Sequence, residues 1–378
     1  MRNSFGVILL PVFSAFLTPV VFGSSIGFVQ TNLASDQAGV APVTDPNLKN
    51  AWGIAASATS PFWLGANGSG TSVLYNGAGA KQGLTVAIPG DGTVTGVGFS
   101  NVAGNFNGDT FLFASEDGTF SGWRGALGTT AETLALGSGA NVYKGLADAS
   151  VGGNQYAYLA NFKTGKIDVM KGNAAAPNLA GNFTDPALPA GYAPFDIANL
   201  GGILYVTYAV QDAAKHDDVA GAGNGIVDAF DVNGNFLGRL VTGGQLDSPW
   251  GLAIAPAGFG DVGGDLLVGN FGNGWINAYT LSGTFVQTLT DAKGNPLSID
   301  GLWGLQFGNG SGSGSKGTLY FTAGPGDEQH GLFGSLVPAP EPATWVLTGL
   351  SLLCIGVYSR SFAAKNFFVS RRNSSNWS

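Results

Sequence analysis

The sequence predicts an all-β protein, a six-bladed β-propeller with four antiparallel strands in each blade. Three observations support this class. A sequence unit recurs six times, each unit contains short apolar runs bounded by turn residues, and the chain has 62 Gly in 378 residues, roughly twice the usual ~7%. Short β-branched and aromatic runs separated by Gly, Asn, Asp and Ser are typical of consecutive antiparallel strands.

The recurring unit opens with an apolar–Gly–apolar triplet, which we interpret as the innermost strand of a blade. From one unit to the next the triplet advances by 43 to 55 residues, close to the blade spacing of about 40–50. Innermost strands crowd together, so glycine is expected at the centre of the triplet. A β-sandwich would not explain the sixfold recurrence. The central residues are Gly53, Gly96, Gly145, Asp196, Gly251 and Gly304.

The units also indicate how the ring closes. The clearest copy spans residues 248–289, where four strand-like runs follow one another. The sixth unit has room for only three such runs before Val337. We therefore predict that residues 28–34 complete the last blade as its outer strand, because closure by both ends of the chain removes an exposed edge.

Three segments divide the chain: residues 1–24, 25–336 and 337–378. The first has one Arg, an apolar run and small residues before a plausible cleavage point, and it predicts a secretory signal peptide. The last contains the apolar stretch 343–358 followed by basic residues. That stretch is short against the ~20 residues of a full span, and we predict a single transmembrane helix there. Cys354, the only cysteine, lies in this tail, so the predicted exported body has no disulfide.

The body is acidic. Residues 1–24 and 340–378 hold five of the 16 basic residues and one of the 24 acidic ones, which leaves 11 basic and 23 acidic side chains between them. Nucleic-acid binding needs a basic surface, so no nucleic-acid partner is expected. The Gly-rich segments are turn-like and do not open helices, which argues against a phosphate-binding loop.

Candidate binding residues lie where second strands end and on two first strands. Converging carboxylate and amide oxygens would suit a hard cation, and Ca²⁺ is the candidate. The same residue types also occur at strand ends because they tolerate turn conformations, and both interpretations stay open. The strand ends supply Asn67, Glu116, Asn161, Asn270 and Asp327, and the first strands supply Lys144 and Asp196.

Two polar segments interrupt the repeat. The insertion 211–225 holds His216, Asp217 and Asp218, which form either a divalent-ion site or a solvated loop at one mouth of the ring. Residues 324–334 hold His330 near Asp327 and Glu328. This group is either a carboxylate–His pair for general acid/base work or a structural turn.

Aromatic residues open three of the units. Trp52, Trp250 and Trp303 occupy the position before the central glycine. Side chains at equivalent positions either pack between blades or form a stacking platform for sugars. No HExxH zinc motif is present in the sequence, and no GxSxG motif lies in a strand–turn–helix context, so no catalytic residue is assigned.

The tail resembles a PEP-CTERM sorting signal, since Pro340, Glu341 and Pro342 precede the short hydrophobic stretch and the arginines. The resemblance implies a Gram-negative bacterium that makes extracellular polysaccharide. It also implies export through the secretion machinery, transient anchoring in the inner membrane and processing by an exosortase. Release to the cell envelope or the extracellular space would follow.

The body is similar to the six-bladed NHL/SMP-30-like propellers, and more closely to an uncharacterised family of exported propellers. Blocks such as SPWGLAIAP (248–256) and FTAGPGDEQHGLFG (321–334) carry the resemblance. The SMP-30-type lactonases hold a metal in the channel, but no ligand set maps onto this chain position by position. We therefore expect a binding or scaffold protein, with extracellular polysaccharide or an envelope protein as partner. The alternative is a metal-dependent hydrolase or lactonase with its site at the mouth of the channel.

Overall fold

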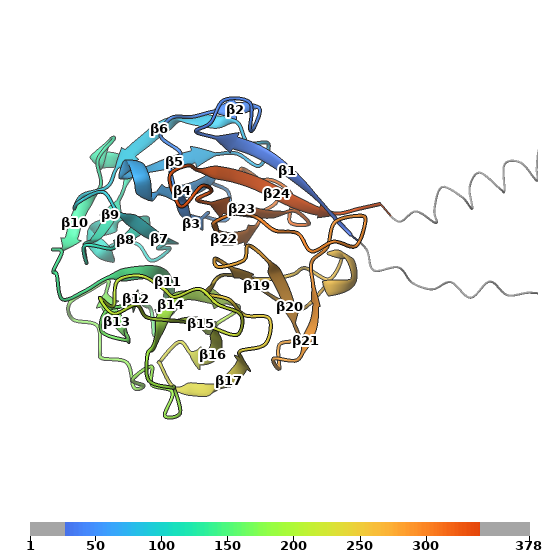
Figure 1. Ribbon diagram of the computed structural model, residues 1–378. Coiled ribbons are helices and arrows are strands. Elements are labelled where there is room, and N and C mark those ends of the chain that lie inside the picture. Colours follow the sequence, from blue (N-terminus) through green and yellow to red (C-terminus); the bar gives the residue numbers. More distant parts are fainter. Residues whose placement is uncertain (1–26, 341–378) are drawn as a thin grey trace, which may run out of the picture.

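The structure, a computed structural model, describes residues 27–340 and forms a ring of six antiparallel β-sheets around a central axis (Figure 1). This confirms the predicted all-β, six-bladed propeller. Among these residues no helix is long and apolar enough to cross a membrane. The predicted signal peptide, the predicted helix at 343–358 and most of the sorting motif (Glu341 and Pro342) lie outside the described residues.

The strands follow one another outward from the axis in each blade. Blade 1 contains β3 (Ala51–Ala55), β4 (Phe62–Ala66), β5 (Thr71–Tyr75) and β6 (Lys81–Ala87), and blade 2 contains β7 (Val94–Phe99), β8 (Phe111–Ser115), β9 (Phe120–Trp123) and β10 (Glu132–Ala135). Blade 4 contains β14 (Tyr192–Leu200), β15 (Ile203–Val210), β16 (Ile226–Asp231) and β17 (Phe236–Thr242), and blade 5 contains β18 (Pro249–Ile254), β19 (Leu266–Asn270), β20 (Ile276–Tyr279) and β21 (Phe285–Thr288).

The N-terminal strand closes the ring as predicted. Blade 6 contains β22 (Leu302–Phe307), β23 (Leu319–Ala323) and β24 (Leu332–Pro338), and β1 (Phe28–Ser35) pairs antiparallel with β24. The two-residue strand β2 (Val43–Thr44) adds to β1 in parallel, so this sheet has five strands. Both ends of the described chain therefore lie in one blade (Figure 1).

Blade 3 departs from the four-strand pattern. It contains only β11 (Tyr143–Val151), β12 (Asn154–Asn161) and β13 (Lys166–Lys171). The following residues 172–191 include Pro177, Pro186 and Pro189 and run as turns and coil. Proline cannot donate a hydrogen bond to a strand ladder, so this segment does not form the expected outer strand.

The triplet glycines are explained by contact between neighbouring blades. A Cβ atom built on Gly53 would lie 2.4 Å from the carbonyl oxygen of Thr95, and one on Gly251 would lie 2.4 Å from that of Trp303. Each of these contacts is with the inner strand of the next blade. The six inner strands can approach this closely only because five of them have no side chain at this position.

Candidate functional site

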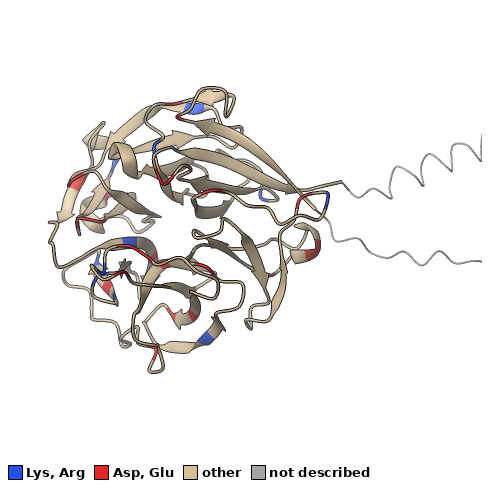
Figure 2. Cartoon of the chain, in the orientation of Figure 1, with Lys and Arg blue, Asp and Glu red and all other residues tan. Residues whose placement is uncertain are grey.

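The inner strands begin, and the second strands end, at the same mouth of the channel, as the pairing of Ala51 with Ala66 and of Tyr143 with Asn161 shows. We call this end the polar mouth, because amides, carboxylates and a lysine gather there. It is defined by Asn50, Asn67, Glu116, Lys144, Asp217 and Glu328. Acidic positions outnumber basic ones over the described ring, and no basic stripe crosses it in this view (Figure 2).

An aromatic cluster fills the channel beneath the polar mouth. Trp52 and Trp303 are stacked with their ring centroids 3.7 Å apart, and Trp250 meets both edge-on. Phe195 and Phe271 pack against Trp303. The three tryptophans are 1–4% exposed, so they offer no open platform for a sugar. They pack on one another across the axis and close the channel; we call these five residues the aromatic plug.

Lys144 occupies, on the inner strand of blade 3, the place that Trp52, Trp250 and Trp303 hold in their blades. Its side chain is 2% exposed, and its Nζ atom forms a short salt bridge with Glu116 Oε1 and a second, at 3.1 Å, with Asp217 Oδ1. The same atom lies 5.1 Å from the centroid of the Trp52 ring, within the range of a cation–π interaction. Burial lowers the pKa of Lys144, but the charges of Glu116 and Asp217 outweigh it and hold the pKa above its ordinary value.

The insertion 211–225, which joins β15 to β16, folds over the polar mouth. Its Asp217 contacts Lys144, and His216 Nδ1 lies 2.9 Å from Asp217 Oδ1. The loop is held from both sides, because Gln211 donates to the carbonyl of Phe162 and the backbone N–H of Gly221 donates to Asp247. The His-Asp pair of the insertion therefore lies at the mouth, and Asp217 links the loop to the inner strand of blade 3.

Two amides extend this network toward blade 6. Asn67 Nδ2 donates to Glu116 Oε2 at 3.0 Å, and Asn50 Nδ2 donates to Asn67 Oδ1 and, at 2.7 Å, to Glu328 Oε2. Asn50, Asp327 and Glu328 have positive φ angles of 45°, 52° and 63°. Such conformations cost energy for residues other than glycine and are enriched at functional sites.

The polar mouth does not fit a resident divalent cation as it is arranged. Ligand atoms of Glu116, His216 and Asp217 lie within 4.8 Å of one another, which is close enough for one metal ion. However, the ammonium group of Lys144 already bonds to both carboxylates. A metal ion there would be repelled by this charge, and the trio supplies far fewer than the 6–8 oxygens that Ca²⁺ prefers.

The remaining residues predicted from strand ends lie elsewhere. Asn161 is buried and donates to Asp168 and Asn141 within its own blade. Asn270 is buried and donates to the carbonyl of Gln245 and to Asn273. Both amides hold turns at the ends of their strands, so they do not join the hydrogen-bond network of the polar mouth.

Of the polar residues in the segment 324–334, Glu328 joins the network of the polar mouth, whereas Asp327 and His330 do not. Asp327 is exposed in the turn after β23. His330 Nδ1 lies 3.0 Å from Asp36 Oδ2, a carboxylate just beyond β1. The carboxylate that contacts His330 is therefore not one of the two neighbours in sequence, and the contact ties blade 6 to its closing strand.

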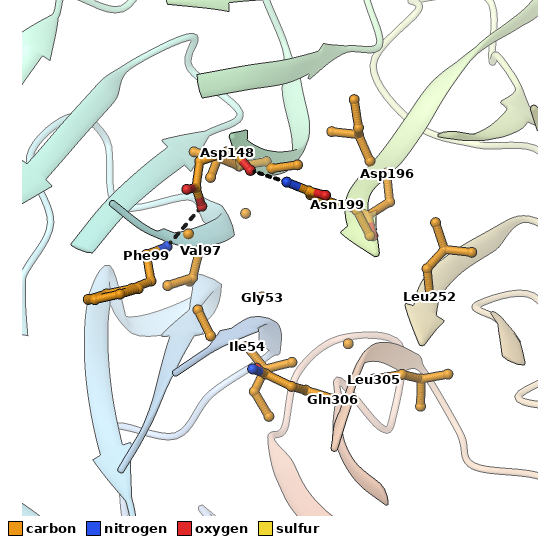
Figure 3. Close-up of a pocket in the computed structure, with 18 of the residues that line it drawn as sticks. Gly53, Ile54, Val97, Phe99, Asp148, Asp196, Asn199, Leu252, Leu305 and Gln306 are labelled. Carbon is orange, nitrogen blue, oxygen red and sulfur yellow. Dashed lines mark hydrogen bonds between the residues drawn. The ribbon is translucent and has the colours of Figure 1, made fainter. Parts of the chain in front are cut away.

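Asp196 lies on the other side of the aromatic plug. It is 6% exposed and lines a cavity of about 310 Å³ that opens at the opposite mouth (Figure 3). We call this opening the apolar mouth, after the aliphatic side chains that line it. Burial raises the pKa of Asp196 well above its ordinary value, although the backbone N–H of Ile197 opposes this.

Asp148, which sequence reasoning missed, is a second carboxyl at the apolar mouth. Burial raises its pKa to about 7, against hydrogen bonds from the Phe99 backbone N–H and the Gln155 amide. Asp228, between β15 and β17, also has its pKa raised to about 7, by burial and by the charge of Asp185. The folded protein thus holds protons that the unfolded chain releases at lower pH.

These carboxyls predict a stability that falls as pH rises. A raised folded-state pKa contributes stability that is complete below the unfolded value near 3.9 and is lost as pH rises through the folded value. We expect the melting temperature to fall from pH 5 to pH 8, and Asp148→Asn to flatten that slope. At roughly 1.4 kcal/mol per pKa unit, the raised pKa of Asp148 alone accounts for several kcal/mol of the free energy of unfolding that is lost as pH rises. A melting temperature that is constant or rises over this range contradicts the expectation.

The fold and the closed channel define a six-bladed β-propeller with a polar network at one mouth, and comparisons with known proteins place it more closely. No family model matches the chain. The uncharacterized protein R648 of Acanthamoeba polyphaga mimivirus is 33% identical over 294 residues, which cover 72% of each chain. The mimivirus uncharacterized protein L690 is 32% identical over 81% of this chain and 84% of its own length. The chain belongs to the family of these two proteins.

Among solved structures, a structural genomics protein of unknown function from Bacteroides thetaiotaomicron is similar to this chain with a TM-score of 0.52. The two are 10% identical, and the match covers 82% of this chain and 76% of that one. At this identity the similarity shows the propeller fold alone.

Proposed function

We propose that the protein is a binding or scaffold protein of the cell envelope that holds its ligand at the polar mouth. The observation that carries this proposal is Lys144, whose buried ammonium group takes the central place among the carboxylates. A metal-dependent site would need that place for its ion. What remains for a ligand is a set of hydrogen-bonding groups at a strained, loop-covered mouth.

The chemistry of the mouth favours a neutral polyhydroxylated ligand. The carboxylates of Glu116, Asp217 and Glu328 outnumber the single ammonium group, so an anionic ligand would be repelled. Carboxylates and amides bind hydroxyl groups well, and charge-assisted hydrogen bonds are the stronger ones. A neutral extracellular polysaccharide has the required hydroxyl groups.

The export that we predict from the two ends of the chain supports the same proposal. The segment 1–24 has the pattern of a signal peptide, and Pro340, Glu341 and Pro342 open a tail that resembles an exosortase sorting signal. We infer passage through the secretion machinery, transient anchoring in the inner membrane, exosortase processing and release to the envelope or the extracellular space. The polysaccharide or an envelope protein would meet the propeller there.

Binding to polysaccharides tests the proposal. We expect the purified protein to bind soluble dextran in preference to the anionic alginate, measured by isothermal titration. Asp217→Asn removes the negative charge of a side chain at the mouth that is 66% exposed, and it is expected to weaken dextran binding about tenfold, a change of about 1.4 kcal/mol. Asp291→Asn, outside the polar mouth, is the control and is expected to bind normally. Equal binding by both variants and the wild type would count against a site at the polar mouth.

The alternative is a metal-dependent hydrolase or lactonase, favoured by the proximity of Glu116, His216 and Asp217. A melt of chelator-treated protein with Ca²⁺, Mg²⁺ or Zn²⁺ separates the two functions. A metal that binds only the folded state adds about 2.7 kcal/mol at a hundredfold excess over its Kd. We expect no saturable rise. A rise for one metal that disappears in Asp217→Asn would support the hydrolase instead.

A further inference from the structure

The cavity at the apolar mouth forms a chamber that the aromatic plug separates from the polar mouth. Its volume of about 310 Å³ is at the lower end of the ~300–1,000 Å³ typical of small-molecule sites. All six inner strands contribute to its wall, and four of the aliphatic side chains surround the open centre in Figure 3. The aliphatic ring consists of Ile54, Val97, Leu146, Ile197, Leu252 and Leu305.

Asp196 places a carboxyl group in this aliphatic ring. The other five blades have glycine at the equivalent position. Gly145 on the neighbouring inner strand makes room for the side chain, since a Cβ there would lie 2.2 Å from Asp196 Oδ1. No Lys, Arg or His lines the described cavity, and within residues 27–340 no basic group forms a salt bridge with Asp196.

Among the other polar groups of the wall, one acceptor has no partner in the described structure. Asp148 accepts from the Phe99 backbone N–H, and Asn199 donates to the backbone carbonyl of Asp148 (Figure 3). Gln306 Oε1, in contrast, is buried without a hydrogen-bond partner in the described structure. The chamber therefore presents two oxygen acceptors, from Asp196 and Gln306, and no cationic donor.

We propose that this chamber binds a small organic ammonium ion, with its charged head at Asp196 and its apolar part within the aliphatic ring. A buried carboxylate is costly unless it is paired, and an ammonium head supplies both the charge and the N–H donors. A metal cation fits poorly, because Ca²⁺ needs about 6–8 oxygen ligands and the rest of the wall is mainly aliphatic. Trp250 lines the same cavity, and tryptophan faces attract organic cations. The proposal goes beyond the polar mouth and does not depend on its function.

Cyclohexylammonium and cyclohexanol form a matched pair of probes for this chamber, because they have similar shapes and differ in charge. At pH 8 we expect cyclohexylammonium to bind the full protein at least tenfold more tightly than cyclohexanol, measured by isothermal titration. Asp196→Asn is expected to abolish this difference. Asp196→Gly restores the residue of the other five blades, so it is expected to fold and to lose the difference as well.

A control at the polar mouth locates the site. Asp217→Asn is expected to leave the affinity for cyclohexylammonium unchanged, because Asp217 lies on the other side of the aromatic plug. Three results would overturn the proposal: equal binding of the amine and the alcohol, unchanged amine affinity in folded Asp196→Gly, or loss of amine binding in Asp217→Asn. The last result would assign the ammonium site to the polar mouth.

Discussion

Replacing Lys144 by methionine is expected to destabilise the folded protein by about 3–5 kcal/mol, the usual effect of removing one partner of a buried ion pair. Glu116 has 11% of its side chain exposed, so its carboxylate would be left buried without a countercharge. Asp217 is 66% exposed, so hydration of its carboxylate would compensate for most of the lost salt bridge to Lys144. Methionine keeps an unbranched apolar side chain of similar size, but it loses both salt bridges and the cation–π contact of Nζ with Trp52, so the effect reports the loss of the charge. Urea unfolding followed by circular dichroism measures the change.

A double variant separates charge from packing. Glu116→Gln in the Lys144→Met background removes the unpaired carboxylate, and we expect it to recover more than half of the lost stability, since directly contacting residues are not additive. Lys316→Met, at an exposed position, is the matched control and is expected to stay within 0.5 kcal/mol of the wild type. If Lys144→Met unfolds at the same urea concentration as the control, the ion pair does not hold the mouth together.

The fold could be predicted because the same packing requirement recurs in each repeat unit. Gly53 and Gly251 are required by the same contact with the next blade, so the same residue type recurs at the same place. The closing strand β1 was predicted from the count of strands in the sixth unit and is confirmed by its pairing with β24. The absence of a fourth strand in blade 3 was not predicted, although the prolines of residues 172–191 indicated it.

The candidate site residues were harder to predict, because polar residues occur at strand ends both as binding groups and as residues that tolerate turn conformations. Asn67 and Asn161 follow equivalent strands and look alike in the sequence, yet Asn67 joins the network of Glu116 and Asn161 holds a turn through Asp168. A residue that differs from those at equivalent positions in the other units is a better indicator of a site. Lys144 takes a position that is aromatic in four other units, and Asp196 takes a position that is glycine in five. These two residues mark the polar mouth and the apolar mouth on either side of the aromatic plug.

Replacing Trp303 by alanine is expected to destabilise the folded protein by about 3–5 kcal/mol. The indole stacks on Trp52 at 3.7 Å and on Phe271 at 4.0 Å between ring centroids, and its Nε1 donates to Asn50 Oδ1 at 3.2 Å. Alanine would leave a cavity where inner strands from several blades meet, and close packing leaves little room for collapse.

Two comparisons make the Trp303 result specific to the plug. Trp303→Phe keeps one aromatic ring and loses the bond to Asn50 and part of the stacked surface, so it is expected to cost less than half as much as alanine. Leu136→Ala removes a side chain that is 85% exposed, and is expected to be neutral within 0.5 kcal/mol. Guanidinium unfolding of the three variants gives the order Trp303→Ala, Trp303→Phe, Leu136→Ala in decreasing loss. Because Trp303 stacks between the two mouths, Trp303→Ala is expected to let Asp217→Asn affect amine binding at Asp196, whereas with an intact plug we expect Asp217→Asn to have no effect there.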